Sequence, residues 1–119
     1  MKKVKLVNIV NINGVFDSVI LSGAPIEDVR AIMRFRREAK PIVDSWNSTI
    51  RDAIIKLKSD NISQEQFNKN LNDALYEEAI REVEVTPFVI TPDGEDIILA
   101  QSKITCKDLE NINEILRPE

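Results

Sequence analysis

The sequence contains no histidine, and this absence excludes more kinds of chemistry than any other feature of its composition. Without an imidazole the chain cannot build the Ser-His-Asp or Cys-His systems of nucleophilic catalysis, and most zinc and haem sites need histidine ligands. Carboxylates remain available as acids, bases or ligands for Mg²⁺ or Ca²⁺. We therefore expect a protein that is not an enzyme and that has no cofactor and no metal site.

Cysteine and long apolar runs are also scarce. The single cysteine, Cys106, cannot form an internal disulfide, and the chain lacks the cysteine framework of small secreted proteins. Polar Asn8, Asn11 and Asn13 interrupt the stretch behind the basic start, so no signal-peptide core forms. No apolar run approaches the roughly 18 residues that span a bilayer. We expect a cytoplasmic protein that makes no contact with a membrane.

The length and charge set further limits. A chain of 119 residues fits a single domain, here residues 1–119. It carries 16 basic and 20 acidic side chains, a formal net charge of -4. This acidic balance argues against a dedicated nucleic-acid binder, whose affinity normally depends on a basic surface.

The strongest pattern in the sequence is a row of mainly apolar residues at alternating spacings of three and four, which we call the seam. It predicts one long helix with a coiled-coil-like packing edge. Pro41 lies inside this helix and removes one backbone hydrogen bond, but the spacing has the same phase on both sides, which predicts a kink. The seam consists of Val29, Ile32, Arg36, Ala39, Val43, Trp46, Ile50, Ala53 and Leu57.

Around this helix the sequence predicts an α+β fold that is mainly α. Residues 3–7 suit an edge strand or an extended lead-in, and residues 7–21 have helical spacing. A second helix begins at Ser63 and should fold back antiparallel on the long one. After Arg81 the pattern becomes extended, and residues 91–96 have the composition of a turn, so we predict a small C-terminal β-hairpin over residues 83–99. Thr105 can cap a terminal helix with Asp108 three residues on.

A basic face on the long helix is the first candidate functional feature. Arg30, Arg34 and Arg37 share one side of the helix, where guanidinium groups could contact phosphates or an acidic partner. The structural alternative is a solvated face on which Glu27 pairs with Arg30 and Arg34 pairs with Glu38. The acidic balance of the whole chain favours this second interpretation.

Two residues of the seam are candidates for a partner interface. Arg36 occupies a packing position, so its head either reaches water or meets a carboxylate from another element or subunit. Trp46 is the only tryptophan and either anchors the helical hairpin or forms an exposed interface anchor.

Two other features receive structural interpretations. Cys106 follows the helix cap Thr105, but there is no histidine or second cysteine to make it a nucleophile. Asp93, Glu95 and Asp96 lack the alternating ligand pattern of a calcium loop, so we interpret them as part of the hairpin turn.

The order of several short motifs resembles a known family. Gly23-Ala24-Pro25 precedes the long charged helix, and Phe67-Asn68-Lys69, Val83-Glu84-Val85 and the final Ile104 to Asp108-Leu109 step follow in turn. Together they are similar to a family of small uncharacterised proteins of tailed bacteriophages and prophages. The resemblance implies no activity and no functional residues. It implies a phage gene product, made in the host cytoplasm, with a part in virion assembly, where it could enter the virion, or in an accessory role.

These observations favour a non-enzymatic phage or prophage protein that acts through protein–protein contacts as an oligomer. The alternative is a small nucleic-acid-associated protein that uses Arg30, Arg34 and Arg37. An enzyme that uses carboxylates with Mg²⁺ is the least favoured reading.

Overall fold

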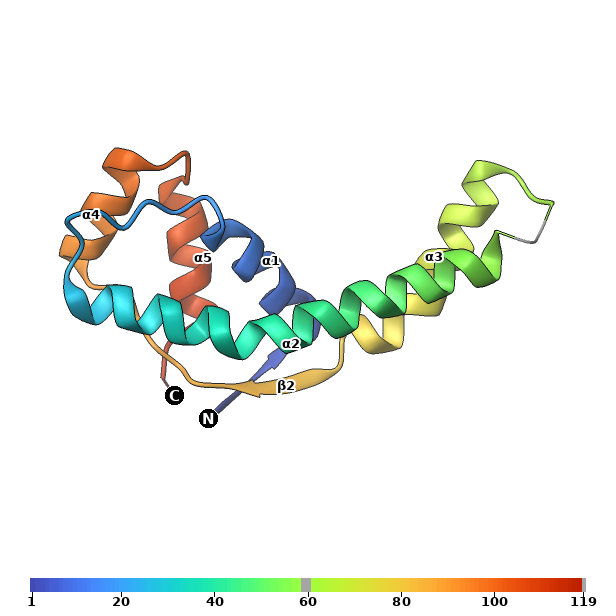
Figure 1. Ribbon diagram of the computed structural model, residues 1–119, viewed down its shortest axis with the longest axis horizontal. Coiled ribbons are helices and arrows are strands. Elements are labelled where there is room, and N and C mark those ends of the chain that lie inside the picture. Colours follow the sequence, from blue (N-terminus) through green and yellow to red (C-terminus); the bar gives the residue numbers. More distant parts are fainter. Residues whose placement is uncertain (59–60, 119) are drawn as a thin grey trace.

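The computed structural model describes residues 1–58 and 61–118, and its elements are mainly helical (Figure 1). A two-stranded antiparallel sheet completes them, so the prediction of a mainly helical α+β fold is confirmed. In chain order the described elements are β1 (Lys2–Lys5), α1 (Leu6–Phe16), α2 (Ile26–Leu57), α3 (Gln64–Ala79), β2 (Glu82–Val85), α4 (Pro92–Gln101) and α5 (Cys106–Leu116).

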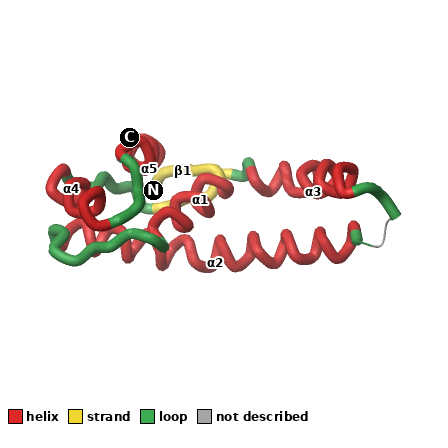
Figure 2. The backbone as a smooth tube through the Cα atoms, turned by 90° about the horizontal axis from the view of Figure 1, so that it is seen from above, coloured by secondary structure: helices red, strands yellow, loops and turns green. Residues whose placement is uncertain are grey.

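The molecule is elongated, with extents of 53 × 29 × 20 Å, because one half of helix α2 lies in a compact part and the other half projects from it. Its N-terminal half lies with α1, α4, α5 and the sheet in a compact part that we call the head (Figure 1). Its C-terminal half, residues 40–57, projects from the head, and α3 runs back beside it (Figure 2). We call residues 40–57 and α3 together the arm.

Helix α2 is continuous from Ile26 to Leu57, as the seam predicts, and Pro41 lies within it. Pro25 sets the extended backbone before its first turn, where Glu27 and Asp28 face the positive end of the helix dipole. The kink at Pro41 stays a prediction.

The predicted C-terminal β-hairpin is wrong. Strand β2 pairs with β1 at the other end of the chain, with Lys3 opposite Glu84 and Lys5 opposite Glu82. These cross-strand pairs of opposite charge favour this register. Leu6 donates its backbone N–H to the Arg81 carbonyl at 2.8 Å, which extends the pairing beyond the strands.

Residues 92–101, expected to supply the turn and second strand of that hairpin, form helix α4 instead. The Thr91 hydroxyl accepts a hydrogen bond from the Gly94 backbone N–H at 3.1 Å, and Pro92 occupies the first helical position. Asp93 and Glu95 lie in the first turn. The residues predicted to form a turn therefore fit the start of a helix equally well. A threonine can cap the helix, a proline fits its first position, and acidic side chains in the first turn interact favourably with the positive end of the helix dipole.

Other boundaries follow the sequence more closely. Thr105 caps α5 in a full capping box with Asp108, and Ser63 caps α3 by accepting from the Gln66 N–H at 3.2 Å, as predicted. The first helix ends at Phe16 and not near residue 21. In the described part of the chain, none of the helices is both long enough and apolar enough to span a bilayer.

The core of the head is built around three aromatic rings. Phe16 of α1 and Phe35 of α2 meet edge to face at 5.6 Å between ring centroids, and Phe88 lies 6.1 Å from Phe35. Buried aliphatic side chains from α1, α2, α4, α5, the sheet and the connections before α4 and α5 belong to the same core: Val4, Ile9, Ile12, Ile32, Ala39, Val85, Ile90, Ile98, Ile104, Leu109, Ile112 and Leu116.

One buried carboxylate joins α2 to α4. Asp28 is 2% exposed and accepts hydrogen bonds from the Thr91 N–H at 3.0 Å and the Thr91 hydroxyl at 2.6 Å. It lies in the first turn of α2 and beside the N-terminus of α4, where both helix ends favour a negative charge. Gly94 is buried against it, and a Cβ at that position would lie 2.7 Å from Asp28 Cγ. These contacts fix the N-terminal end of α2 in the head.

Candidate interaction surface

Arg36 occupies a seam position where α1 crosses α2, and its guanidinium group points out of the core. Its guanidinium forms an ion pair with Asp17, just beyond the end of α1, and its Nε donates to Asn13 Oδ1 at 3.4 Å. The Arg36 side chain is still 41% exposed. The residue thus combines both expected alternatives, since it meets a carboxylate from another element of its own chain and also reaches water.

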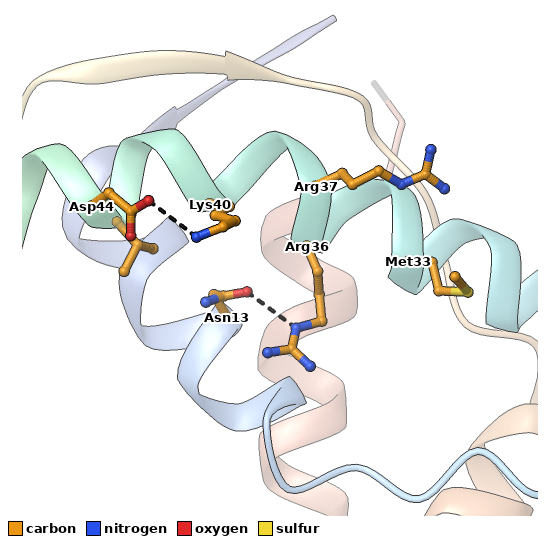
Figure 3. Close-up of a pocket in the computed structure, with 7 residues that line it drawn as sticks. Asn13, Met33, Arg36, Arg37, Lys40 and Asp44 are labelled. Carbon is orange, nitrogen blue, oxygen red and sulfur yellow. Dashed lines mark hydrogen bonds and ion pairs between the residues drawn. The ribbon is translucent and has the colours of Figure 1, made fainter.

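An open groove of about 480 Å³ lies beside Arg36, between the C-terminal half of α1 and the middle of α2 (Figure 3). Its lining combines cations with apolar surface. Lys40 forms an ion pair with Asp44 at 3.2 Å, whereas Arg37 has no ion pair among the described residues. Met33, at the head end of the groove, is 51% exposed. The lining residues are Asn13, Met33, Arg36, Arg37, Lys40, Val43 and Asp44.

The three arginines of the candidate basic face lie at the surface. Arg30, Arg34 and Arg37 are all exposed, and none has an ion pair within the described part of the chain. The predicted pairs of Glu27 with Arg30 and Arg34 with Glu38 are absent there.

Glu38 explains one of these missing pairs. Its Oε1 turns toward the strand side of α2 and accepts from the Thr86 N–H at 3.1 Å and the Thr86 hydroxyl at 3.0 Å. The sequence spacing predicted that Glu38 pairs with Arg34, one helical turn away. Its carboxylate instead accepts hydrogen bonds from Thr86, which comes from a distant part of the chain.

Trp46 lies on the seam within the arm and is half-buried. Two of the four seam residues of the head, Ile32 and Ala39, are 1% and 0% exposed, whereas Val29 and Arg36 are half-buried and no residue of α2 beyond Ala39 is fully buried. Helix α3 has no fully buried residue along its whole length. Two helices alone can cover only one side of each other, so the arm leaves part of its apolar surface open to solvent.

The two sides of the arm differ in charge. When two helices pack antiparallel, the residues that come just after matching packing positions lie on the same side of the pair. The packing positions meant here are Trp46 and Ala53 in α2 and Phe67 and Ala74 in α3. On one side these residues are Asn47 and Ile54 of α2 with Asn68 and Leu75 of α3. The uncharged flank so formed, with the adjoining seam residues, comprises Val43, Asn47, Ile50, Ile54, Asn68, Leu71 and Leu75.

Charged residues lie on both sides of the seam: Asp44, Arg51 and Lys58 border the uncharged flank, and Asp52, Lys56, Asp73 and Glu77 lie on the opposite side. We call this opposite side the charged flank, and it comprises Ser45, Thr49, Asp52, Lys56, Asn70, Asp73 and Glu77. A surface that must stay in water is normally charged in this way, whereas depletion of charge marks the centre of an interface. The only signal of the uncharged flank in the sequence is the seven-residue spacing of Asn47 and Ile54.

The remaining candidates do not gather into a site. Cys106 is an exposed free thiol at the start of α5, and Asp93, Glu95 and Asp96 lie in α4 rather than in a hairpin turn. Across residues 1–58 and 61–118, no group of three acidic or cysteine side chains is placed to hold a metal ion.

Comparison with known proteins does not add a relative: no family model, curated protein or solved structure matches the chain.

Proposed function

We propose that this protein acts without catalysis, through protein–protein contacts made by its arm, and that it works as an oligomer. One observation carries the proposal. The same unbroken seam that buries Ile32 and Ala39 in the head buries no residue completely in the arm. A partner packed against the arm would remove the remaining apolar surface from water, which is the main driving force of association.

The uncharged flank indicates where such a partner would lie. Ile50, Ile54, Leu71 and Leu75 are each half-buried, and the amides of Asn47 and Asn68 beside them are exposed. The α2 part of the flank runs from Val43 to Ile54, roughly 18 Å, and two helices are about 20 Å wide. Roughly 350 Å² could thus be covered on each partner, or about 700 Å² in total, which is the size of a weak or transient contact.

The resemblance of the short motifs to those of small phage and prophage proteins supports a biological setting. In that setting the protein is made in the host cytoplasm and takes part in virion assembly or in an accessory process. Self-assembly through a helical arm is compatible with either task.

Light scattering tests the central part of the proposal. At high micromolar concentration we expect a mass near that of a dimer, about 27 kDa for a 13.5 kDa chain. Dilution should lower the average mass. A constant monomer mass across the concentration range would contradict association through the arm.

The exposed basic face supports a second candidate, a nucleic-acid-associated protein. Arg30, Arg34 and Arg37 are free of ion pairs among the described residues, so their charge is available to phosphates. This candidate predicts a gel shift of DNA or RNA at low salt that fades steeply with added salt and disappears with Arg34→Glu. The absence of any shift at low salt would remove it.

A further inference from the structure

The solvent side of α2, from its start to the beginning of the arm, carries a row of residues that we call the outer stripe. Its members follow one another at spacings of four and three, so they lie on one side of the helix. Each of the first four precedes a buried residue of α2 by two positions. Because successive residues turn by about 100°, the row lies opposite the core. All its side chains are exposed, and the outer stripe consists of Ile26, Arg30, Met33, Arg37 and Lys40.

Two members of the outer stripe are large apolar side chains that lie in water. Ile26 is 64% exposed and Met33 is 51% exposed, and they are seven residues, or two helical turns, apart. A single exposed apolar residue is ordinary. A pair at this spacing on one helix face instead matches the anchors with which helices pack on a partner, and methionine is enriched in interfaces.

The other members of the outer stripe are cations with little to neutralise them. Arg30 and Arg37 have no ion pair among the described residues. Lys40 pairs with Asp44 at 3.2 Å, but the two side chains are 77% and 63% exposed, so this contact is weak and easily exchanged. Arg36, beside the row, is already paired with a carboxylate of its own chain.

The carboxylates of this half of α2 do not cancel the charge of the row. Asp28 is buried against α4, and Glu38 is held by Thr86 on the strand side of the helix. Glu27 is exposed, but it lies about 100° around the helix from Ile26. The surface along the row is therefore positive, although the whole chain has a formal net charge of -4.

Cations and apolar side chains in one row define the chemistry of a matching partner. A nucleic-acid backbone could use the cations, but it would leave Ile26 and Met33 in water. A second copy that presented the same row would place like charges opposite each other, which opposes association. An amphipathic helix with carboxylates beside its apolar side chains satisfies both parts of the row.

The dimensions of the surface suit one helix. The row from Ile26 to Lys40 is about 21 Å long, which equals about four helical turns. Met33, Arg37 and Lys40 also line the open groove of about 480 Å³, which Asn13 of α1 borders. The groove therefore gives a side chain of the docked helix a place beside the row.

We propose that the outer stripe is the docking site for an acidic amphipathic helix of a partner protein. Its carboxylates pair with Arg30, Arg37 and Lys40. Its apolar side chains pack on Ile26 and Met33, and one of them enters the groove. Docking here does not require association through the arm, because the outer stripe and the uncharged flank share no residue.

Titration of labelled synthetic helices with the full chain, followed by fluorescence anisotropy at low salt, tests the proposal. The three helices are about 18 residues long. The first carries leucine and glutamate on one face, the second has lysine in place of glutamate, and the third has serine in place of leucine. A short DNA duplex is the fourth probe.

Two variants change the row, and each has a matched control. Arg37→Glu reverses one charge, and its control is Lys107→Glu at an exposed position of α5. Met33→Ser removes one apolar side chain. Its control is Val89→Ser, at a residue that is 48% exposed in the connection before α4.

We expect the helix with leucine and glutamate to bind and the helix with lysine not to bind. Removal of its leucines, Arg37→Glu and Met33→Ser should each weaken binding about tenfold or more, and both controls should bind like the original chain. No binding of the first helix, or binding that neither variant weakens, overturns the proposal. Equal binding of the helix with serine, or tighter binding of DNA than of any helix, assigns the row to polyanions and also overturns it.

Discussion

Gly94→Ala tests whether the buried contact between α2 and α4 holds the head together. Gly94 lies in the first turn of α4 and is buried. A methyl group at this position would lie 2.7 Å from Asp28 Cγ, closer still to its Oδ2, and 3.1 Å from Ile90 Cγ2. No ordinary Cβ contact is this short, so Asp28 or the whole N-terminus of α4 must move.

The size of the effect follows from the bonds that this movement breaks. Asp28 accepts two hydrogen bonds from Thr91, and a hydrogen bond to a charged group contributes about 1.5 to 3 kcal/mol. Alanine returns about 1 kcal/mol through its better helix propensity. We therefore expect Gly94→Ala to lower the free energy of unfolding by about 2 to 5 kcal/mol.

Urea denaturation followed by circular dichroism measures this loss, and Gly14→Ala is the matched control. Gly14 lies inside α1, is exposed, and a Cβ there would meet nothing within 4 Å. The same substitution should therefore stabilise the protein by about 0.5 to 1 kcal/mol at this site. A Gly94→Ala variant as stable as the original chain would refute the close packing of Asp28 on α4.

Two further predictions use the same denaturation assay. Thr91→Val should cost about 2 kcal/mol, because the hydroxyl both caps α4 and donates to Asp28, and a loss under about 0.5 kcal/mol would contradict that double role. Arg36→Ala should cost less than about 1 kcal/mol, because its ion pair with Asp17 is partly exposed; a loss above about 2 kcal/mol would show that the guanidinium is buried.

The long helix was predictable because its signal is repeated many times. The seam holds its spacing through about four heptads, and a packed apolar face of that length has no competing interpretation. The caps at Ser63 and Thr105 were predictable for a different reason, since a cap depends on residues only three apart.

The sheet and α4 were not predictable from local patterns. Thr91 and Pro92 fit a turn and a helix start equally well, and contact with Asp28, more than sixty residues earlier, favours the helix. The partner of β2 lies at the opposite end of the chain, although the alternating charges of Lys3, Lys5, Glu82 and Glu84 contained a usable signal.

The candidate surface was partly predictable. The sequence placed Arg36 on the seam, but its contact with Asp17 requires α1 to end at Phe16, earlier than the apolar spacing suggested. The groove also needs α1 to cross α2, which no helical pattern specifies. By contrast, the uncharged flank follows directly from the seam and could have been read from the positions that follow Trp46 and Ala53.

Sedimentation velocity on two matched variants tests the central claim most directly. Asn47→Glu places a charge on the uncharged flank, and Ser45→Glu places the same charge on the charged flank; both positions are exposed, so neither change disturbs packing within the chain. We expect Asn47→Glu to weaken self-association at least tenfold and Ser45→Glu to leave it unchanged. Equal association of both variants and the original chain would contradict assembly through the uncharged flank of the arm.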